Sequence, residues 1–97
     1  MVTYVALFNF TEKGLNAVKD TTKRATAVRE AAKKAGVTIR ELVWTMGKYD
    51  VVGVLEAKDE ETIAAFILSI GVQGNVRSHS LRAYTASEMD AILAKLP

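Results

Sequence analysis

Residues 45–52, Thr-Met-Gly-Lys-Tyr-Asp-Val-Val, lie at the centre of this 97-residue chain and predict how it folds. Apolar runs flank them on both sides, beginning at Ile39 before the stretch and ending at Ala57 after it. Between the runs lie a glycine and an aspartate, Gly47 and Asp50, which are typical of the short turn of a β-hairpin. The stretch therefore predicts two antiparallel strands that are neighbours in a sheet.

Strand and helix patterns alternate on both sides of this hairpin. Alternation with a period of two predicts four strands, which are Thr3–Phe10, Val37–Met46, Asp50–Ala57 and Asn75–Tyr84. Three predicted helices each begin at a residue that can cap them, namely Thr11, Asp59 and Thr85. The last of these starts includes a capping box with Glu88. Glycines end the first two helices, Gly36 the first and either Gly71 or Gly74 the second.

Apolar or small residues at spacings of three and four give each predicted helix a stripe. The stripe of the first helix is Leu15, Val18, Thr22, Ala25, Val28, Ala32 and Ala35. The stripe of the second is Ile63, Phe66, Ile67 and Ile70, and that of the last is Met89, Ile92, Leu93 and Leu96. The first helix is expected to run for about six turns, with the pair Thr21-Thr22 as a place where it can kink.

The predicted order of elements is β-α-β-β-α-β followed by a terminal helix. This order is typical of the ferredoxin-like fold, an α+β fold with a four-stranded antiparallel sheet. If both crossovers are right-handed, the two long helices lie on one face of the sheet and leave the other face bare. Because the first three strands carry apolar residues on both alternations, we expect a second copy to cover that bare face as a homodimer or higher oligomer.

Composition limits the kind of protein. With 97 residues, the chain is expected to form one domain, residues 1–97. It has no cysteine, which excludes disulfides, a thiolate nucleophile and a cysteine-bound metal. The first residues lack the pattern of a secretion signal, and no apolar run reaches the length of a membrane span. We therefore expect a soluble cytoplasmic protein that has no membrane partner.

The net charge of +2 is unevenly spread along the chain. Residues 12–35 carry seven Lys or Arg and three Asp or Glu, which gives this segment +4 and leaves −2 for the rest. No aromatic side chains are interleaved with the basic residues, as they often are on nucleic-acid-binding surfaces. We interpret the segment as a solvated helix face and predict no nucleic-acid partner.

Three segments together resemble one known family. They are residues 47–52, Gly-Lys-Tyr-Asp-Val-Val, residues 74–77, Gly-Asn-Val-Arg, and residues 81–85, Leu-Arg-Ala-Tyr-Thr. In these segments and in element order the chain resembles the GYD domain family, which is named for its Gly-x-Tyr-Asp hairpin. The family's usual Pro-Asp before the second helix is Lys58-Asp59 here, which keeps the cap. The resemblance implies a ferredoxin-like fold of the dimeric α/β-barrel type, and it implies no particular reaction.

Tyr49 and Asp50 are the first candidates for a ligand site. A phenol beside a carboxylate at the end of a strand could bind or protonate a small polar ligand. The alternative is that Asp50 accepts backbone N–H bonds in the turn and that Tyr49 packs over the hairpin or a neighbouring subunit.

His79 and Arg77 are the other ligand-binding candidates, and they share one side of the last strand. His79 could act as a general base or ligand contact, or could be a hydrogen-bonded histidine on the sheet or at an interface. Since it is the only histidine, we predict no metal site, and no cofactor motif is present. Arg77 and Arg82 point to opposite sides, and either could hold an anion or pair with an acid.

Three functions are compatible with these patterns. The first is a homo-oligomeric α/β-barrel module that binds a small molecule. The second is a small cofactor-independent enzyme of the oxygenase or isomerase type, which would use a cavity between sheet and helices with Tyr49, Asp50 and His79 as its polar groups. The third is a purely structural assembly module. The sequence leaves open whether the protein is an enzyme.

Overall fold

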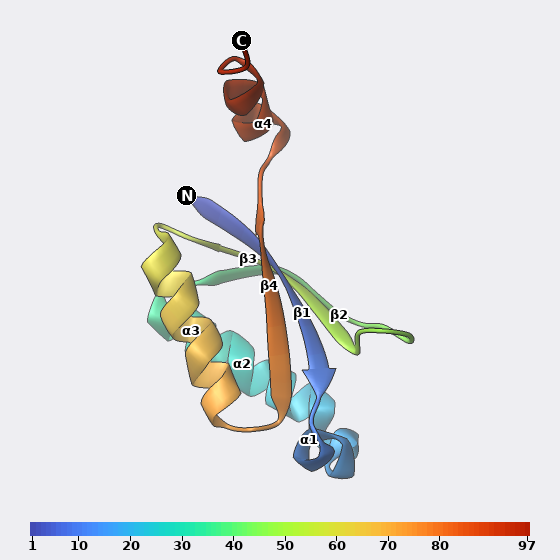
Figure 1. Cartoon of the computed structure of the whole chain (residues 1–97). Coiled ribbons are helices and arrows are strands. Elements are labelled where there is room, and N and C mark those ends of the chain that lie inside the picture. Colours follow the sequence, from blue (N-terminus) through green and yellow to red (C-terminus); the bar gives the residue numbers. More distant parts are fainter.

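The computed structural model describes residues 1–97 as a four-stranded antiparallel sheet with two long helices on one side (Figure 1). The strands lie in the order β2-β3-β1-β4. The elements are β1 (Val2–Phe10), α1 (Glu12–Asn16), the 3₁₀ turn η1 (Val18–Asp20), α2 (Thr21–Ala35), β2 (Thr38–Trp44), β3 (Val51–Ala57), α3 (Glu60–Val72), β4 (Val76–Ala83) and α4 (Ala86–Leu93). The predicted ferredoxin-like α+β fold is confirmed.

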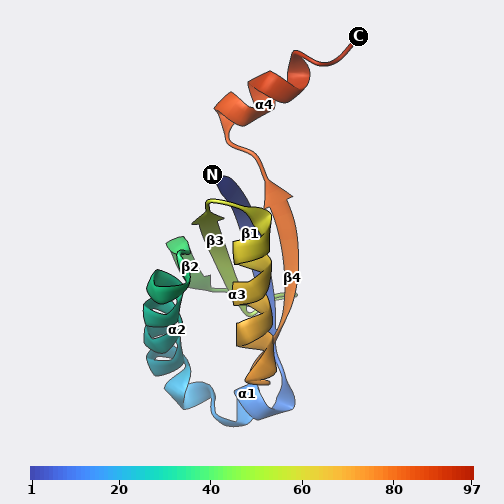
Figure 2. The same cartoon turned by 90° about the vertical axis from the view of Figure 1, so that its left-hand side faces the viewer.

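Helices α2 and α3 lie against the same face of the sheet, as the right-handed crossovers require (Figure 2). The buried core lies between this face and the helices and consists of Ala6, Phe8, Ala32, Val37, Val51, Leu55, Ala57, Ile63 and Phe66. The even-numbered residues of β1 and the odd-numbered residues of β3 point toward it. The predicted alternation of both strands is therefore confirmed.

The first predicted helix is divided rather than continuous. Thr11 caps α1 through its hydroxyl, which accepts from the backbone N–H of Gly14 at 3.1 Å, and Gly36 ends α2 in the left-handed conformation at φ 79°. The break precedes Thr21, the first residue of α2. Leu15 and Val18 lie before the break and are 60% and 37% exposed, so the prediction of one stripe across both pieces was wrong.

The central hairpin joins β2 to β3 through residues 45–50. Thr45 closes it, because its backbone N–H donates to the carbonyl of Asp50 at 2.8 Å and its hydroxyl donates to the carbonyl of Tyr49 at 2.5 Å. Gly47 provides the positive φ of 145° that the turn uses. Strand β2, which forms one edge of the sheet, has a bulge between Ile39 and Glu41, and Arg40 within it pairs with Glu56 at 2.6 Å.

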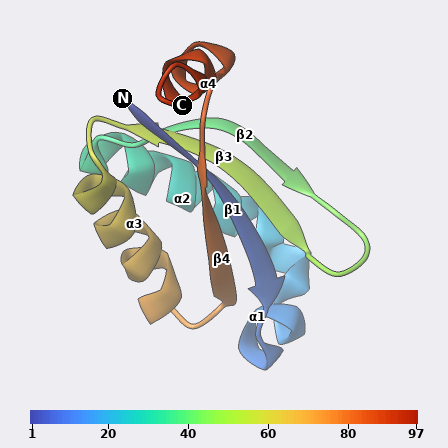
Figure 3. The same cartoon turned by 45° about the horizontal axis from the view of Figure 1, so that its top comes forward.

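The face of the sheet opposite α2 and α3, here called the open face, is covered by no element of the chain (Figure 3). Its apolar residues fall in two cross-strand rows, Val43–Val52–Leu7 and Val54–Val5–Leu81. Val43 and Leu81 are 47% and 54% exposed. Water therefore meets a contiguous apolar surface that spans all four strands, which fits the expectation of a bare face.

Helix α4 stands beyond the end of β4 and packs on neither face of the sheet (Figures 1 and 2). The predicted capping box is present: the hydroxyl of Thr85 accepts from the N–H of Glu88, and the Glu88 carboxylate accepts from the N–H of Thr85 at 2.9 Å. No residue of α4 is buried, so its stripe of Met89, Ile92, Leu93 and the following Leu96 is exposed. None of the helices is both long enough and apolar enough to span a membrane.

Candidate functional site

Asp50 joins the hairpin to the end of β1. Its carboxylate oxygen Oδ2 accepts from the backbone N–H of Phe10 at 2.9 Å, and its own N–H donates to the carbonyl of Phe8 at 2.9 Å. The backbone pairing between β1 and β3 ends at Phe8 and Val51. Beyond that pair, the Asp50 carboxylate accepts the hydrogen bond from the Phe10 N–H that a backbone carbonyl of β3 would otherwise accept. The donor belongs to β1 and not, as the structural alternative had it, to the turn.

Tyr49 and His79 meet on the open face although 30 positions separate them in the sequence. Their ring centroids are 5.9 Å apart with an interplanar angle of 63°, an edge-to-face arrangement. The Lys48 ammonium lies 5.8 Å from the centre of the Tyr49 ring. Asn9, on β1 between them, donates from its side chain to the carbonyl of Lys48 at 2.7 Å. These contacts tie the part of the hairpin that leads into β3 to the end of β1 and to β4 on the open face.

The two arginines of β4 point to opposite sides, as predicted. Arg77 shares the open face with His79, is exposed, and forms no ion pair. Arg82 lies on the other side, where its guanidinium pairs with Glu60 at 3.2 Å and stacks 4.5 Å from the ring centre of Tyr84. Tyr49, His79 and Arg77 therefore form one polar group at the end of the open face, with Asp50 beside them in the hairpin.

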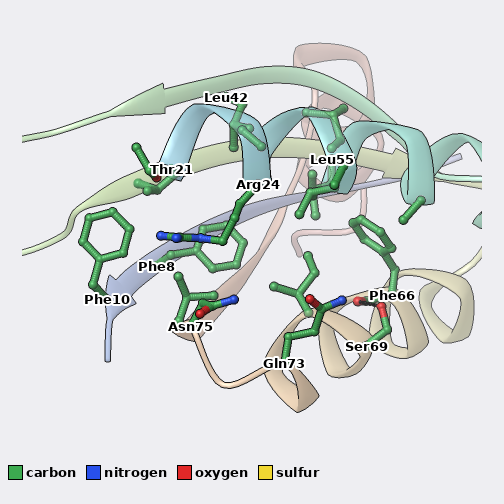
Figure 4. Close-up of a pocket in the computed structure, with 18 of the residues that line it drawn as sticks. Phe8, Phe10, Thr21, Arg24, Leu42, Leu55, Phe66, Ser69, Gln73 and Asn75 are labelled. Atoms are coloured by element: carbon green, nitrogen blue, oxygen red, sulfur yellow. Dashed lines mark hydrogen bonds between the residues drawn. The ribbon is translucent and has the colours of Figure 1, made fainter. Parts of the chain in front are cut away.

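A separate cavity of about 170 Å³ lies on the other side of the sheet, between it and helices α2 and α3 (Figure 4). Aromatic and aliphatic side chains of the sheet form its floor, among them Phe8, Phe10 and Leu55. Helix α2 lines the other side with small residues such as Ala25, which is half-buried, and Ala31, which is exposed. Because alanine side chains are short, they fill little of the space between the helix and the sheet.

None of the four candidates lines this cavity. The prediction that Tyr49, Asp50 and His79 would be the polar groups of a cavity between sheet and helices was wrong. All three belong to the hairpin and the open face, because strand alternation turns His79 away from the helices and the ladder position of Asp50 directs its carboxylate at β1.

The polar groups of the cavity are a set that sequence reasoning missed: Arg24, Ser69, Gln73 and Asn75, with Thr21 and Trp44 at one end. Trp44 donates from Nε1 to the Thr21 hydroxyl at 3.0 Å and so ties β2 to the start of α2. Arg24 directly precedes Ala25, a member of the small and apolar stripe of α2. A charged residue next to such a stripe was the signal in the sequence that could have indicated a polar group at the edge of the cavity.

Two proteins of Thermus thermophilus are similar to this chain. The chain is 29% identical over 94 residues to the one named "Glutamine synthetase and cystathionine beta-lyase binding protein", and the match covers 96% of this chain and 99% of that protein. The crystal structure of TTHA0845 from the same organism has a similar fold, with a TM-score of 0.58 at 24% identity. That similarity covers 89% of this chain and 96% of the other.

A family model settles which group of proteins shares these features. The model described as "GYD domain" matches residues 4–93, which include the hairpin, both long helices, the open face and α4. The Gly-x-Tyr-Asp segment at the centre of that match is the one whose aspartate binds β1 and whose tyrosine meets His79. The chain belongs to the GYD domain family.

Proposed function

We propose that this chain is a protein-binding module that acts as a single domain, forms a homo-oligomer and docks on a metabolic enzyme. The observation that carries the proposal is the amount of apolar surface that the chain itself leaves uncovered, on the open face and on α4. The named binding role of the Thermus thermophilus relative, which matches along nearly its whole length, supports a protein partner and suggests glutamine synthetase and cystathionine beta-lyase as the enzymes to test.

The open face is suited to a second copy of the chain. It is broad, and its two apolar rows, each of which crosses three strands, together reach all four strands, which is the shape that a second sheet packs against. Tyr49, His79 and Arg77 lie at its end, where they are placed to donate hydrogen bonds across the rim of such a contact. We therefore assign these three candidates to the oligomer interface and keep Asp50 beside them as the residue that fixes the hairpin.

Helix α4 is suited to the enzyme. Its stripe is narrow, it stands clear of the sheet, and its orientation is fixed at the start by the capping box and by Arg82, which pairs with Glu60 on α3 and lies 4.0 Å from Glu88 on α4. A short helix with apolar residues at spacings of three and four is the form in which many proteins enter a groove on a partner.

Charge substitutions separate the two surfaces. We expect Val54→Lys on the open face to convert an oligomer into a monomer, measured by light scattering at micromolar concentration. Val72→Lys is the matched control, because Val72 is 86% exposed at the end of α3 and lies on neither surface. We expect Ile92→Lys on α4 to keep the oligomer and to weaken binding to both enzymes at least tenfold in surface plasmon resonance, with Ala91→Lys as its control.

The outcomes that contradict the proposal are specific. A parent protein that is monomeric throughout the micromolar range rejects the oligomer. If the unsubstituted protein binds neither enzyme more tightly than it binds an unrelated enzyme, the proposed enzyme partners are wrong. If Ile92→Lys dissociates the oligomer and Val54→Lys does not, the assignment of the two surfaces is wrong.

Binding of a small molecule is a second proposed role, and the cavity beneath α2 favours it. The lining contains no histidine, aspartate or glutamate, the side chains that most often transfer protons in enzymes. The geometry therefore supports a ligand-binding role there better than the alternative of a small acid–base enzyme. A fluorescence or NMR screen of small aromatic and aliphatic acids against the purified protein tests this role.

A further inference from the structure

We propose that the cavity beneath α2 selects a small organic carboxylate, with an apolar ring or short branched chain in the cavity and the carboxylate paired with Arg24. This inference rests on the proposed small-molecule role and adds to it the chemical class of the ligand. It follows from the volume of the cavity, from the lack of an acidic partner for the Arg24 guanidinium, and from the amides that line the same cavity.

The volume and lining favour a ring-sized apolar group. The cavity has about 170 Å³ of space, and an apolar cavity of about 150 Å³ is large enough to bind benzene. Phe8, Phe10, Leu55 and Phe66 supply aromatic and branched surface from the sheet and α3, while α2 contributes alanines. A six-membered ring or a branched chain of similar size would contact these side chains and fill the space that the alanines leave.

Arg24 is a positive charge without an acidic partner at the wall of this apolar space. Its guanidinium is half-buried and donates from Nη1 to the carbonyl of Ala17 at 2.7 Å and from Nη2 to the carbonyl of Gly14 at 3.3 Å. No carboxylate of the chain lies within ion-pair distance of it, whereas Arg40 and Arg82 both have one. A guanidinium has five N–H donors, so Arg24 retains donors and a full charge for a ligand.

The groups near Arg24 are also those that a carboxylate requires. Figure 4 shows the guanidinium directed toward the side of the cavity lined by Phe8, Phe10 and Asn75. The side-chain amides of Asn75 and Gln73 line the same cavity, Asn75 half-buried and Gln73 exposed, and make no hydrogen bond within the chain, so their N–H groups are available to a ligand oxygen. Since no acidic side chain lines the cavity, nothing there repels an anion.

A pair of probes of equal shape tests the assignment. Phenylacetate and phenylacetamide have the same ring and nearly the same volume, and only the first carries a charge. We expect phenylacetate to bind the full-length protein at one site per chain, with NMR shifts at cavity residues of α2 and α3. Because charge-assisted hydrogen bonds are the stronger ones, we expect it to bind at least about tenfold more tightly than phenylacetamide in calorimetry.

Substitutions test whether Arg24 causes the preference for phenylacetate over phenylacetamide and whether both probes bind in the cavity. Arg24→Gln should abolish the preference for phenylacetate while retaining a neutral donor, and Arg24→Lys should retain part of it. Arg29→Gln is the matched control, because Arg29 is also on α2 and also donates to a carbonyl, that of Ile39 at 3.5 Å, but does not line the cavity. Ala25→Leu, which places a branched side chain in part of the cavity and keeps Arg24, should abolish binding of both ring-sized probes.

Each contrary result overturns a defined part of the inference. Equal affinity of the parent for the two probes rejects the carboxylate preference and leaves the small-molecule role standing. Absence of binding of both probes to the parent at millimolar concentration rejects this ligand class outright. A preference that survives Arg24→Gln, or probe binding that survives Ala25→Leu in a variant whose circular dichroism matches the parent, shows that the ligand binds elsewhere.

Discussion

Gly14 offers the sharpest test of how the start of α1 is held. Replacing a helical glycine by alanine ordinarily stabilises a protein by about 0.5–1 kcal/mol. At Gly14 the structure predicts the opposite, because a Cβ there would lie 2.0 Å from the backbone oxygen of Asn75 and 2.9 Å from its carbonyl carbon. Both atoms belong to the main chain, so no side-chain rotation relieves the contact.

The expected magnitude follows from what must move. An ordinary contact needs at least 3.4 Å, so α1 and the loop before β4 must separate by more than 1 Å. That loop accepts a hydrogen bond from the Thr11 N–H to the Asn75 carbonyl at 3.0 Å and another from the Thr11 hydroxyl to the Gly74 carbonyl at 2.5 Å. Overpacking typically costs about 1–3 kcal/mol, and a lost hydrogen bond costs about 1 kcal/mol. After the helix-propensity gain is subtracted, we expect Gly14→Ala to destabilise the fold by about 2 kcal/mol.

Urea denaturation followed by far-UV circular dichroism measures this difference, with thermal melting as a second readout. For a domain of this size about 2 kcal/mol corresponds to a melting temperature lower by roughly 10 °C. Gly71→Ala is the matched control, since Gly71 also lies in a helix and a Cβ there would meet no atom within 4 Å. We expect that variant to be as stable as the parent or slightly more stable. A Gly14→Ala protein at least as stable as the parent would refute the reasoning.

Three further predictions concern single contacts. Asp50→Ala should be less stable than Asp50→Asn by about 1 kcal/mol, because only Asn keeps an acceptor for the N–H at the end of β1; equal stability in urea would contradict this. Hydrogen bonds from the side chain and then the backbone of Thr62 lower the pKa of Asp59, which caps α3. A lowered pKa means that this contribution is present above the aspartate's unfolded pKa and is lost as pH falls through the folded one. Asp59→Ala should therefore lower the urea midpoint at neutral pH, and an equally large difference at strongly acidic pH would show that the charge is irrelevant. A double-mutant cycle of Tyr49→Leu and His79→Leu should give a coupling energy of about 0.5–1 kcal/mol, and zero coupling would show that the contact between the two rings does not stabilise the fold.

The sequence predicted the fold because its local signals agree with one another. Each helix start that was predicted from a capping residue is a start in the structure, and the hairpin lies where glycine and aspartate interrupt two apolar runs. The two faces of β1 follow directly from alternation, since a period of two leaves no freedom in which side chain points inward. The bare sheet face then followed from connectivity alone.

The candidate site was only partly predictable, because it depends on contacts between distant segments. Strand alternation assigned Arg77 and His79 to one face, but the meeting of Tyr49 with His79 depends on how the residues that lead into β3 are held against the end of β1. The cavity was missed for a different reason. A stripe of alanines on α2 indicates a buried face, and whether it fills the space beneath depends on the distance between helix and sheet, which no local pattern encodes.

The bulge in β2 affects how far association through this sheet extends. An edge strand with a regular row of free N–H and C=O groups can recruit further strands without limit, whereas a bulge and a charged side chain at the edge oppose such growth. In β2 the irregularity between Ile39 and Glu41 interrupts that row, and Arg40 with Glu56 places an ion pair beside it. Extension of the sheet past β2 is thereby disfavoured, and the proposed homo-oligomer would have to form through the apolar face rather than by addition of strands at this edge.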